Sequence, residues 1–540
     1  MLSYRKLAMR VLGHPLHTGG IDSPRPASQR AAAFILTAAM LTTLAAPAFA
    51  DIWHIENGDI TISAGESGNN VTQNNNTTYG DTNTIITNQN KDKASSNTVT
   101  IETNDKNDKV EVTLKDVNID TSSRNKAAVS VTGEGDTNIK LNGDNALKSD
   151  IYRSGIYGSG SLTISGGEND SLTAQGGSGA NGISSSGSLT ISGGTVTANG
   201  DDGGRGISSS GSVTISGGST VTANGGSGTI SGGDGIWSGG GVTISGGSTV
   251  TANGGNGGSL VGGDGIRSGG GLTVSDGTVT AKGGNGDSKD GYGGDGIRSG
   301  GVVTISGNTV NAAGGYGGKV GGYGICSFDR VAISGGTVEA AGGNGSTGGG
   351  SGIYSSVIDL SGSLELTAKA GSPTGKALLQ NGRELDLDTI KDKLGPGAKV
   401  TATDANGDSK QVSIPRPVEP EEPVIPEESS SSSDGGSATP SAPVSPLPGL
   451  TVTDKDGQRI SYTSTQSGNT LTVCVGRFTA SFRISLAALR QLRAEGIDTI
   501  TFQTILCSTT LSLDELLAMG GEDAEVVLTH RFTDSSLTVG

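Results

Sequence analysis

One position in a repeated segment carries side chains that could recognise a ligand. Between residues 150 and 360 a Gly-Ile dipeptide recurs, and the residue after it changes from repeat to repeat. In chain order that position holds Tyr157, Ser184, Ser208, Trp237, Arg267, Arg298, Cys326 and Tyr354. On three successive repeats the residue before Gly-Ile is acidic, namely Asp234, Asp264 and Asp295. If equivalent positions stack, aromatic rings, guanidinium groups and carboxylates come together on one face.

Such a face is typical of carbohydrate recognition. Aromatic faces pack on the C–H faces of sugars, and the arginine fork binds a uronate carboxylate through two hydrogen bonds. A polymer that crosses several repeats would also bind at several points at once. The predicted carbohydrate-binding residues are Tyr157, Trp237, Arg267, Arg298 and Tyr354. The alternative is that the arginines only pair with neighbouring aspartates on a solvated face, an interaction worth about 0–1 kcal/mol.

The three aspartates allow two further interpretations. Carboxylate oxygens are ligands for Ca²⁺, so Asp234, Asp264 and Asp295 are candidate metal ligands and calcium is the one candidate cofactor. Aspartate also shapes turns by accepting hydrogen bonds from local backbone amides. Spacing in the sequence leaves both interpretations open.

Short strands must position this column. The Gly-Ile isoleucines stand at 156, 183, 207, 236, 266, 297, 325 and 353. Each is followed by two three-residue segments, such as Leu189-Thr190-Ile191 and Val196-Thr197-Ala198, that alternate apolar and polar residues. Glycine pairs between them permit sharp corners. The pattern predicts a mainly β protein, a parallel β-helix with three short strands per rung.

The same alignment predicts which side chains face inward and outward. An inner aliphatic stack should run through Ile164, Ile191, Ile215, Ile244, Val274, Ile305 and Ile333. One outer ladder should contain Thr163, Thr190, Thr214, Thr243, Thr273 and Thr304, and a second should contain Thr173, Thr197, Thr222, Thr251 and Thr280, continued by Asn311 and Glu339. Repeat length varies mainly at one corner, which a solenoid tolerates. No repeat has the apolar stripe of a helix, and the period does not fit a nine-residue calcium-binding roll.

The N-terminal segment indicates export. Residues 1–50 place basic residues before the apolar run AAAFILTAAMLTTLAAPAFA, which ends in a small-x-small pattern at Ala48-Phe49-Ala50. This arrangement predicts a cleaved signal peptide, with an uncleaved membrane anchor as the alternative. No later apolar run is long enough to span a bilayer. We therefore expect an extracellular protein, either secreted or associated with the cell surface, and no transmembrane segment in the mature chain.

The net charge of the chain after removal of residues 1–50 limits the classes of partner that we expect. Residues 1–50 carry five basic residues and one acidic residue, so their removal leaves 32 Lys+Arg, 52 Asp+Glu and a net charge of −20. A surface of this charge repels nucleic-acid phosphates and anionic lipid headgroups. Nucleic acid is therefore not an expected partner.

Composition divides the rest of the chain. Residues 51–150 should form irregular first rungs of the β-helix, with the Asn-rich stretch 69–90 as an exposed loop, and residues 151–370 should form the regular rungs. Residues 371–414 should form a C-terminal cap with a short helix at 387–394. Residues 415–449 should form a Pro/Ser/Glu-rich linker. Residues 450–540 should form a small α/β domain with an internal duplication. Cys474 and Cys507 both lie on predicted strands of that domain, either as a disulfide or as two buried thiols.

A family resemblance adds to this interpretation. The segments VTLKDVNIDTSSRNKAAVSV (112–131), IKLNGDNALKS (139–149) and SGSLTISGGTVTANG (186–200) resemble secreted bacterial carbohydrate-binding-domain proteins with a right-handed β-helix similar to that of pectate lyases. The resemblance covers residues 51–370. It implies binding of a plant-type polysaccharide, of the pectic or β-glucan class, with calcium. It does not cover the linker or the C-terminal domain.

Three functions are consistent with these observations. The first is a non-catalytic polysaccharide-binding protein, the second an adhesin or structural surface stalk, and the third a calcium-dependent lyase. A lyase needs Ca²⁺ to acidify a sugar proton and a base such as Arg267 or Arg298 to remove it. The nearly identical rungs around these arginines argue against an active site, and the four histidines form no cluster. We therefore expect a binding protein and not an enzyme.

Overall fold

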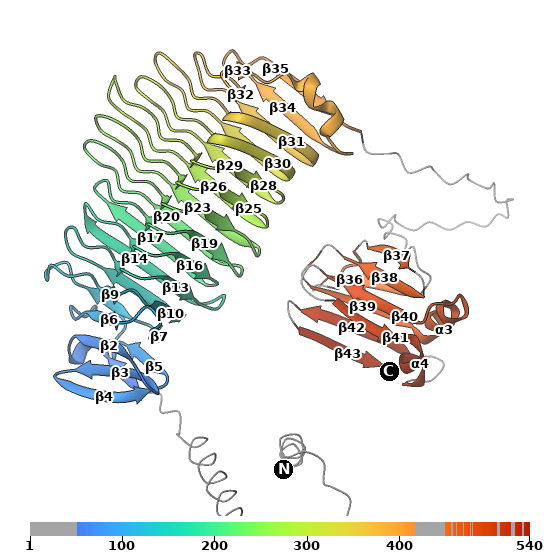
Figure 1. The fold of residues 1–540 in the computed structure, drawn as a ribbon, viewed down its shortest axis with the longest axis horizontal. Coiled ribbons are helices and arrows are strands. Elements are labelled where there is room, and N and C mark those ends of the chain that lie inside the picture. Colours follow the sequence, from blue (N-terminus) through green and yellow to red (C-terminus); the bar gives the residue numbers. More distant parts are fainter. Residues whose placement is uncertain are drawn as a thin grey trace, which may run out of the picture. The chain divides into compact units, whose positions relative to one another are not determined.

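The computed structural model describes residues 51–415 and 449–540, except 455–456, 461, 468, 476, 478, 505–507, 520–523, 532–533 and 540. The expected signal peptide and nearly all of the expected linker lie outside the described residues. The chain forms two units that divide after Pro420. The first unit contains a parallel β-solenoid of about 14 turns (Figure 1). Within the described part of the chain, no helix has the length and apolar character needed to cross a membrane.

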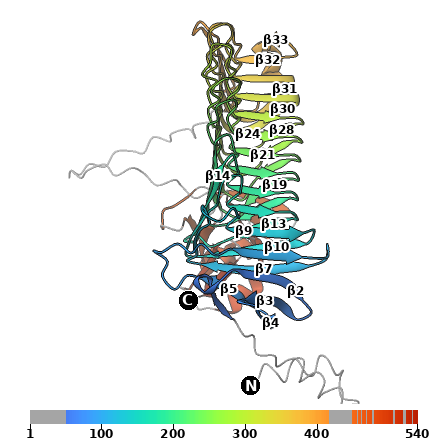
Figure 2. The ribbon, with the colours of Figure 1, turned by 90° about the vertical axis from the view of Figure 1, so that its left-hand side faces the viewer.

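Three stacks of parallel strands build the coil, and its rungs follow one another like a ladder (Figure 2). The first stack contains β2 (Ile60–Gly65), β6 (Val99–Thr103), β9 (Val129–Gly133), β12 (Ile156–Gly158), β15 (Ile183–Ser185), β18 (Ile207–Ser209), β21 (Ile236–Ser238), β24 (Ile266–Ser268) and β27 (Ile297–Ser299). The second contains β1 (Ile52–His54), β5 (Thr84–Thr87), β7 (Lys109–Lys115), β10 (Asp136–Asn142), β13 (Leu162–Ser165), β16 (Leu189–Ser192), β19 (Val213–Ser216), β22 (Val242–Ile244), β25 (Leu272–Val274) and β28 (Val303–Ile305). The third contains β8 (Asn118–Asp120), β11 (Asp144–Lys148), β14 (Ser171–Ser178), β17 (Thr195–Asp201), β20 (Thr220–Asn224), β23 (Ser248–Asn253), β26 (Gly277–Lys282) and β29 (Thr309–Ala313). The long strands β30 (Ile325–Ala341) and β31 (Ile353–Lys369) bend through all three stacks.

The register confirms the predicted inner stack. Ile191 pairs with Ile164 below it and with Ile215 above it, and the pairing continues in the same way to Ile333. These side chains are fully buried. Each rung therefore buries its apolar face against its neighbours, and aliphatic residues suffice for the core.

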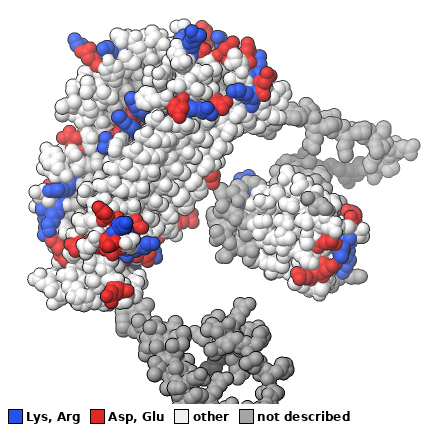
Figure 3. Space-filling model, viewed as in Figure 1, with Lys and Arg blue, Asp and Glu red and all other residues white. Residues whose placement is uncertain are grey.

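The two threonine ladders are also confirmed. Thr190 pairs with Thr163 and Thr214 on the second stack, and Thr197 pairs with Thr173 and Thr222 on the third. Threonine keeps the outer face of a strand polar while its methyl group packs on the sheet. The face of the coil in Figure 3 accordingly carries few charged side chains over its middle rungs.

Glycine has a second role that the corner interpretation does not include. The loops between the third and first stacks are also in register: Gly228, Gly257, Gly286, Gly317 and Gly345 pair successively as single bridges. Backbone amides join these layers, as from Gly255 to the carbonyl of Gly233 at 2.8 Å and from Gly263 to the carbonyl of Gly255 at 2.8 Å. A Cβ atom on Gly263 would overlap the carbonyl oxygen of Gly233. Backbone packs directly on backbone here, which only glycine allows.

The expectation of an exposed Asn-rich loop at 69–90 is wrong. This stretch forms β3 (Gly68–Gln73) and β4 (Asn76–Asp81), which extend β2 as antiparallel strands, and then β5. Asn74 and Asn75 make the turn with φ of 53° and 63°, a region that asparagine tolerates. Asn69 and Gln73 are buried because their side-chain amides donate to Thr84 Oγ1 at 2.9 Å and to the carbonyl of His54 at 2.9 Å. The hairpin follows η1 (Ile55–Asn57) at the start of the coil.

The other end of the coil is closed by a different set of elements. β32 (Leu378–Gln380) continues the first stack and turns back as β33 (Arg383–Glu384), and β34 (Lys399–Thr403) continues the third and turns back as β35 (Ser409–Ser413). The short helix expected at 387–394 is the 3-10 helix η2 (Leu387–Lys393). Its Leu387 and Ile390 are buried in the core of the coil.

The second unit has two four-stranded sheets and two short helices. One sheet has the order β36 (Leu450–Thr453), β39 (Thr479–Ser485), β42 (Glu525–Arg531), β43 (Asp534–Val539), and the other β37 (Thr463–Ser467), β38 (Thr470–Cys474), β40 (Thr499–Gln503), β41 (Ser508–Ser512). Helix α3 (Leu486–Ala494) connects β39 to β40, and α4 (Leu513–Ala518) connects β41 to β42. Each helix follows a serine and buries two leucines, Leu486 and Leu489 in α3 and Leu513 and Leu516 in α4.

A strand–helix–strand order therefore occurs twice in this unit, as β39–α3–β40 and as β41–α4–β42. Phe482 of the first sheet and Phe502 of the second are fully buried, with ring centroids 4.7 Å apart. Cys474 is half-buried and its Sγ lies 3.5 Å from Gln503 Oε1. Cys507 lies outside the described residues, so the choice between a disulfide and two thiols stays a prediction.

Candidate ligand-binding groove

The residues after Gly-Ile stack as the sequence predicts. Trp237 on β21 pairs with Arg267 on β24, which pairs with Arg298 on β27. The column continues downward through Ser208 and Ser184 to Tyr157, and upward through Cys326 to Tyr354. Tyr157 is exposed, whereas Cys326 is fully buried, and burial raises its pKa to about 12. The Cys326 thiol is therefore unreactive at neutral pH.

The residues before Gly-Ile form a ladder of buried carboxylates. Asp234, Asp264 and Asp295 are 7%, 5% and 4% exposed. Oδ1 of Asp234 accepts a hydrogen bond from the backbone amide of Asp264 at 2.9 Å, and Oδ1 of Asp264 accepts one from the amide of Asp295 at 2.7 Å. Asp295 in turn accepts from the amide of Tyr323 at 2.7 Å. Each aspartate thus ties its own rung to the next. The turn-forming interpretation expected bonds to local amides and is wrong for these contacts, because each amide donor lies 28–31 residues further along the chain.

The second carboxylate oxygens face the arginines. Asp295 Oδ2 lies 3.4 Å from Nη1 of Arg298, and Asp264 Oδ2 lies 3.9 Å from Nη1 of Arg267. The predicted ion pairs therefore exist, but they do not lie on a solvated face as the alternative expected. The carboxylates are buried, and the side chains of Arg267 and Arg298 remain 49% and 37% exposed. A guanidinium with an exposed edge keeps donors that are free to meet a ligand.

Burial sets the protonation of this cluster. Removal from water raises the pKa of Asp295 to about 6. The charged carboxylate loses its hydration, and the hydrogen bond from Tyr323 and the positive charges of the arginines compensate for only part of that loss. The pKa of Asp264 is also raised, first by burial and then by the negative charges of Asp295 and Asp234. Burial alone would lower the pKa of Arg298, but the charges of Asp295 and Asp264 outweigh it and raise that pKa. Arg298 therefore stays charged under conditions in which Asp295 takes up a proton.

Arg205 belongs to this site and is missing from the predicted set. It stands before Gly-Ile one rung below Asp234, and its Nε donates to Asp234 Oδ2 at 3.2 Å. Its guanidinium carbon lies 4.4 Å over the centre of the Trp237 ring. One face of that ring is thus already covered, so Trp237 supports Arg205 and offers at most its other face to a sugar. The signal for Arg205 was present, since it occupies the same position of its repeat as the aspartates.

The three arginines and two of the aspartates line one groove. A cavity of about 560 Å³ runs across the rungs and is lined by Arg205, Arg267, Arg298, Asp234 and Asp264 together with the glycine loops. Tyr157 does not reach it and lines a separate cavity. Tyr354 lies two rungs above Arg298, where its ring stacks on Tyr323 with centroids 5.0 Å apart. The structure therefore brings the arginines together in the groove. Trp237 packs on Arg205 but is not one of the lining residues, and the two tyrosines lie elsewhere.

The aspartates do not fit the expected calcium site. In each of the three, Oδ1 is already bound to a backbone amide and Oδ2 faces an arginine. They stand one above another on successive rungs, and among the described residues no group of three His, Cys, Asp or Glu side chains converges to hold a metal ion. A cation at this position would also meet the positive charge of the arginines.

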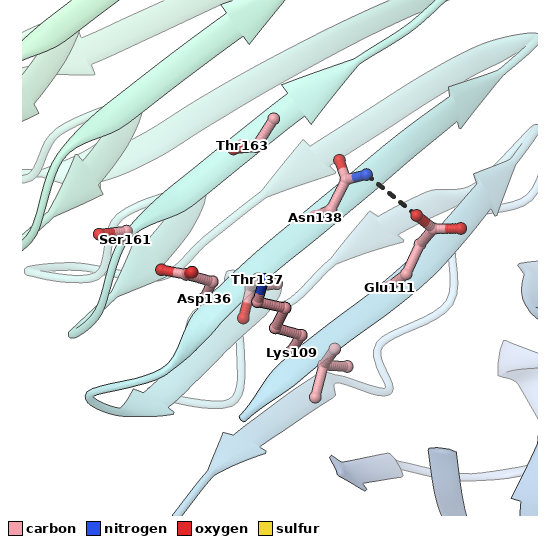
Figure 4. A pocket seen from close by; sticks show the side chains of 8 residues that line it. Lys109, Glu111, Asp136, Thr137, Asn138, Ser161 and Thr163 are labelled. Atoms are coloured by element: carbon pink, nitrogen blue, oxygen red, sulfur yellow. Dashed lines mark hydrogen bonds between the residues drawn. The ribbon is translucent and has the colours of Figure 1, made fainter. Parts of the chain in front are cut away.

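A further cavity, of about 390 Å³, lies on the second stack (Figure 4). One of its lining carboxylates, Glu111, is already engaged: Asn138 donates to Glu111 Oε2 at 3.2 Å, and Lys140, which does not line the cavity, pairs with Glu111 Oε1 at 2.6 Å. No aromatic side chain lines it. The groove with the arginines is therefore the stronger candidate site.

Comparison of the chain with protein-family models, with curated proteins and with solved structures finds no match. The assignment of a function accordingly depends on the groove itself.

Proposed function

We propose that the protein is a non-catalytic polysaccharide-binding protein that acts outside the cell, secreted or at the cell surface, and that its groove binds an anionic polymer. The observation that carries this proposal is the groove with three guanidinium groups over a backbone floor of glycine: that of Arg205 and those of Arg267 and Arg298, two and three rungs above it. Bidentate arginine contacts suit the carboxylates of a polyuronate, and their repetition along the coil suits a repetitive ligand.

Charge balance supports an anionic ligand over a neutral one. Each of the three arginines pairs with one aspartate, but the arginine side chains are 37–49% exposed and the aspartate side chains 5–9% exposed. The groove thus presents positive charge at its surface in a chain of formal net charge −16. Of the two polymer classes that the sequence suggests, the pectic class carries carboxylates and fits this groove better than a β-glucan.

The same geometry favours binding over lyase chemistry. A lyase of the expected kind needs calcium bound beside the scissile sugar, and the three aspartates do not fit that ion. Arg267 and Arg298, the two candidate bases, stand beside buried carboxylates, and for Arg298 this environment raises the pKa and holds the guanidinium protonated. A protonated guanidinium binds an anion but does not accept a proton.

The test is calorimetric titration of the full chain with polygalacturonate. We expect binding by the wild-type chain and a loss of at least about tenfold in affinity for Arg205→Ala/Arg267→Ala, since each charge-assisted pair contributes on the order of 1–3 kcal/mol. Arg383→Ala, an exposed arginine in the C-terminal cap, is the matched control and should bind like wild type. Equal affinity in all three proteins would refute the groove as the site. No binding by the wild type would favour the stalk alternative.

A further inference from the structure

A second cavity lies on the same strip of the coil, nearer the N-terminal end. It encloses about 560 Å³ and is lined by, among others, Lys126, Tyr152, Arg153, Tyr157 and Ser184. Tyr157 and Ser184 belong to the column that continues to Trp237, Arg267 and Arg298. The two cavities therefore follow one another along one face of the first stack.

They also adjoin each other. Ser184 of the second cavity and Asn181 of the groove lie three residues apart on one rung. The ring of Tyr152 lines the second cavity and lies against Gly179, which lines the groove. An ideal Cβ on Gly179 would lie 2.9 Å from Cε1 of Tyr152, so the two residues are in close contact, and the φ of 76° at Gly179 favours glycine there. Only the serines Ser184 and Ser208 separate Tyr157 from Trp237 in the column, and these small side chains leave the path open.

The backbone at Tyr152 is strained. Its φ is 59°, in the left-handed region that bulky residues rarely occupy, and its side chain is 78% exposed. The residue is held there by a hydrogen bond from its amide to the carbonyl of Ser178 at 2.9 Å, one rung above. Nothing in the hydrophobic core requires an exposed ring in this conformation. Strain of this kind is concentrated where a side chain must be presented to a ligand.

The charges of the second cavity match the chemistry of the groove. Arg153 is exposed, and its Nε donates to Asn125 Oδ1 at 3.3 Å. Within the described residues it has no carboxylate partner within 4 Å, so its guanidinium is available to a ligand. Lys126, by contrast, pairs with Asp59 at 3.0 Å. One free guanidinium beside two exposed tyrosine rings, Tyr152 and Tyr157, suits a sugar acid: the rings meet the sugar face and the arginine meets its carboxylate.

We propose that the second cavity is another binding site for an anionic polysaccharide and that one polymer chain runs along the coil axis through both cavities. This inference rests on the function proposed for the groove. The two cavities together span eight successive strands, β6, β9, β12, β15, β18, β21, β24 and β27. Seven steps of about 4.8 Å give a track of about 34 Å. The preferred ligand is therefore a long oligomer or polymer and not a short oligosaccharide.

Stoichiometry and chain length test this inference directly. Galacturonate oligomers of increasing length are titrated into the full chain, and the number bound per chain is measured. We expect dimers and trimers to bind weakly at two sites per chain, and oligomers long enough to span the track to bind once, with affinity higher by about 10²-fold or more. A single site for short oligomers, with no gain in affinity for longer ones, would overturn the inference.

Two variants separate this result from the fate of the proposed function. Tyr152→Asn removes the ring while asparagine tolerates the same φ, so the fold should be retained; Arg153→Ala removes the free guanidinium. Each should lower the affinity for the long oligomer about tenfold or more and leave one short oligomer bound in the groove. If both variants bind the long oligomer like wild type, the second site is refuted while the groove stands. If wild type binds no oligomer of any length, the proposed function fails first.

Discussion

Oδ1 of Asp264 accepts a hydrogen bond from the backbone amide of Asp295, 2.7 Å away on the next rung. The same bond recurs below, from the amide of Asp264 to Asp234, and above, from the amide of Tyr323 to Asp295. Residues that the sequence offers as metal ligands thus hold successive rungs together. They also keep Arg267 and Arg298 beside the groove, because Oδ2 of each carboxylate faces a guanidinium.

We predict that neutralising Asp295 stabilises the coil at neutral pH. The folded protein raises the pKa of this carboxyl from 3.8 to about 6, so the folded state binds its proton more tightly than the unfolded state. Stability from this group is therefore complete below pH 3.8 and is lost as the pH rises through about 6. Two units of pKa correspond to about 3 kcal/mol. Asp295→Asn keeps an oxygen acceptor for Tyr323 and removes the charge.

Denaturant unfolding at pH 5 and pH 8 measures this effect. The charged and titratable groups that interact electrostatically with Asp295, directly or through Asp264, are Asp264, Arg267, Arg298, Cys326 and Asp234. Wild type should lose more stability between these pH values than Asp295→Asn, and the variant should be the more stable protein at pH 8. If the difference in unfolding free energy between the two proteins is the same at pH 5 and pH 8, the pKa of Asp295 is not raised in the folded state.

A second prediction concerns Trp237 and Arg205. Because the Arg205 guanidinium lies 4.4 Å over the indole, Trp237→Ala should weaken polyuronate binding by releasing that guanidinium. We expect a loss of about tenfold, in line with cation–π contacts of roughly 1–2 kcal/mol. Once Arg205 is replaced by alanine, the further change Trp237→Ala should have little effect.

The double-mutant cycle in polyuronate affinity decides between two roles for the ring. Losses that do not add indicate that Trp237 acts through Arg205. Fully additive losses would instead mean that the indole contacts the sugar by itself. Trp237→Phe, which retains an aromatic face, is the matched control and should retain most of the affinity.

A third prediction concerns the glycine layer. Gly263→Ala places a methyl group against the carbonyl of Gly233, so a rung must shift. We expect a loss of unfolding free energy of about 1–3 kcal/mol, the range for overpacked sites. Gly307→Ala is the control, because its methyl group would meet only the carbonyl of Ser275 at 3.4 Å, an ordinary contact. Thermal unfolding of the two variants should show a lower midpoint for the first alone. Equal midpoints would contradict direct backbone packing.

The inner stacks and threonine ladders were predictable because they depend only on period. Once the Gly-Ile dipeptides are aligned, an alternation of two fixes which side of the strand each residue occupies, and Ile191 can stack only between Ile164 and Ile215. The column from Tyr157 to Tyr354 follows by the same argument. The sequence alone therefore predicts which residues stack on one another in successive rungs.

Burial of the aspartates was not predictable in this way. The carboxylates of Asp234, Asp264 and Asp295 are buried beside glycine loops that vary in length and still bond to one another in register, which the spacing of the repeats does not indicate. The Asn-rich hairpin was missed for a related reason: Asn69 and Gln73 occupy inward positions only because Thr84 and His54 accept their amide protons. Composition alone makes such residues look exposed.

The central claim is that the groove recognises the charge of a polysaccharide. The most direct measurement compares the affinity of the full wild-type chain for polygalacturonate with that for fully methyl-esterified polygalacturonate, which has the same backbone without the carboxylates. We predict tight binding of the acid and an affinity at least about tenfold lower for the ester, because the ester has no carboxylates for the arginines to bind. Equal affinity for the two polymers, or preference for the ester, would contradict it.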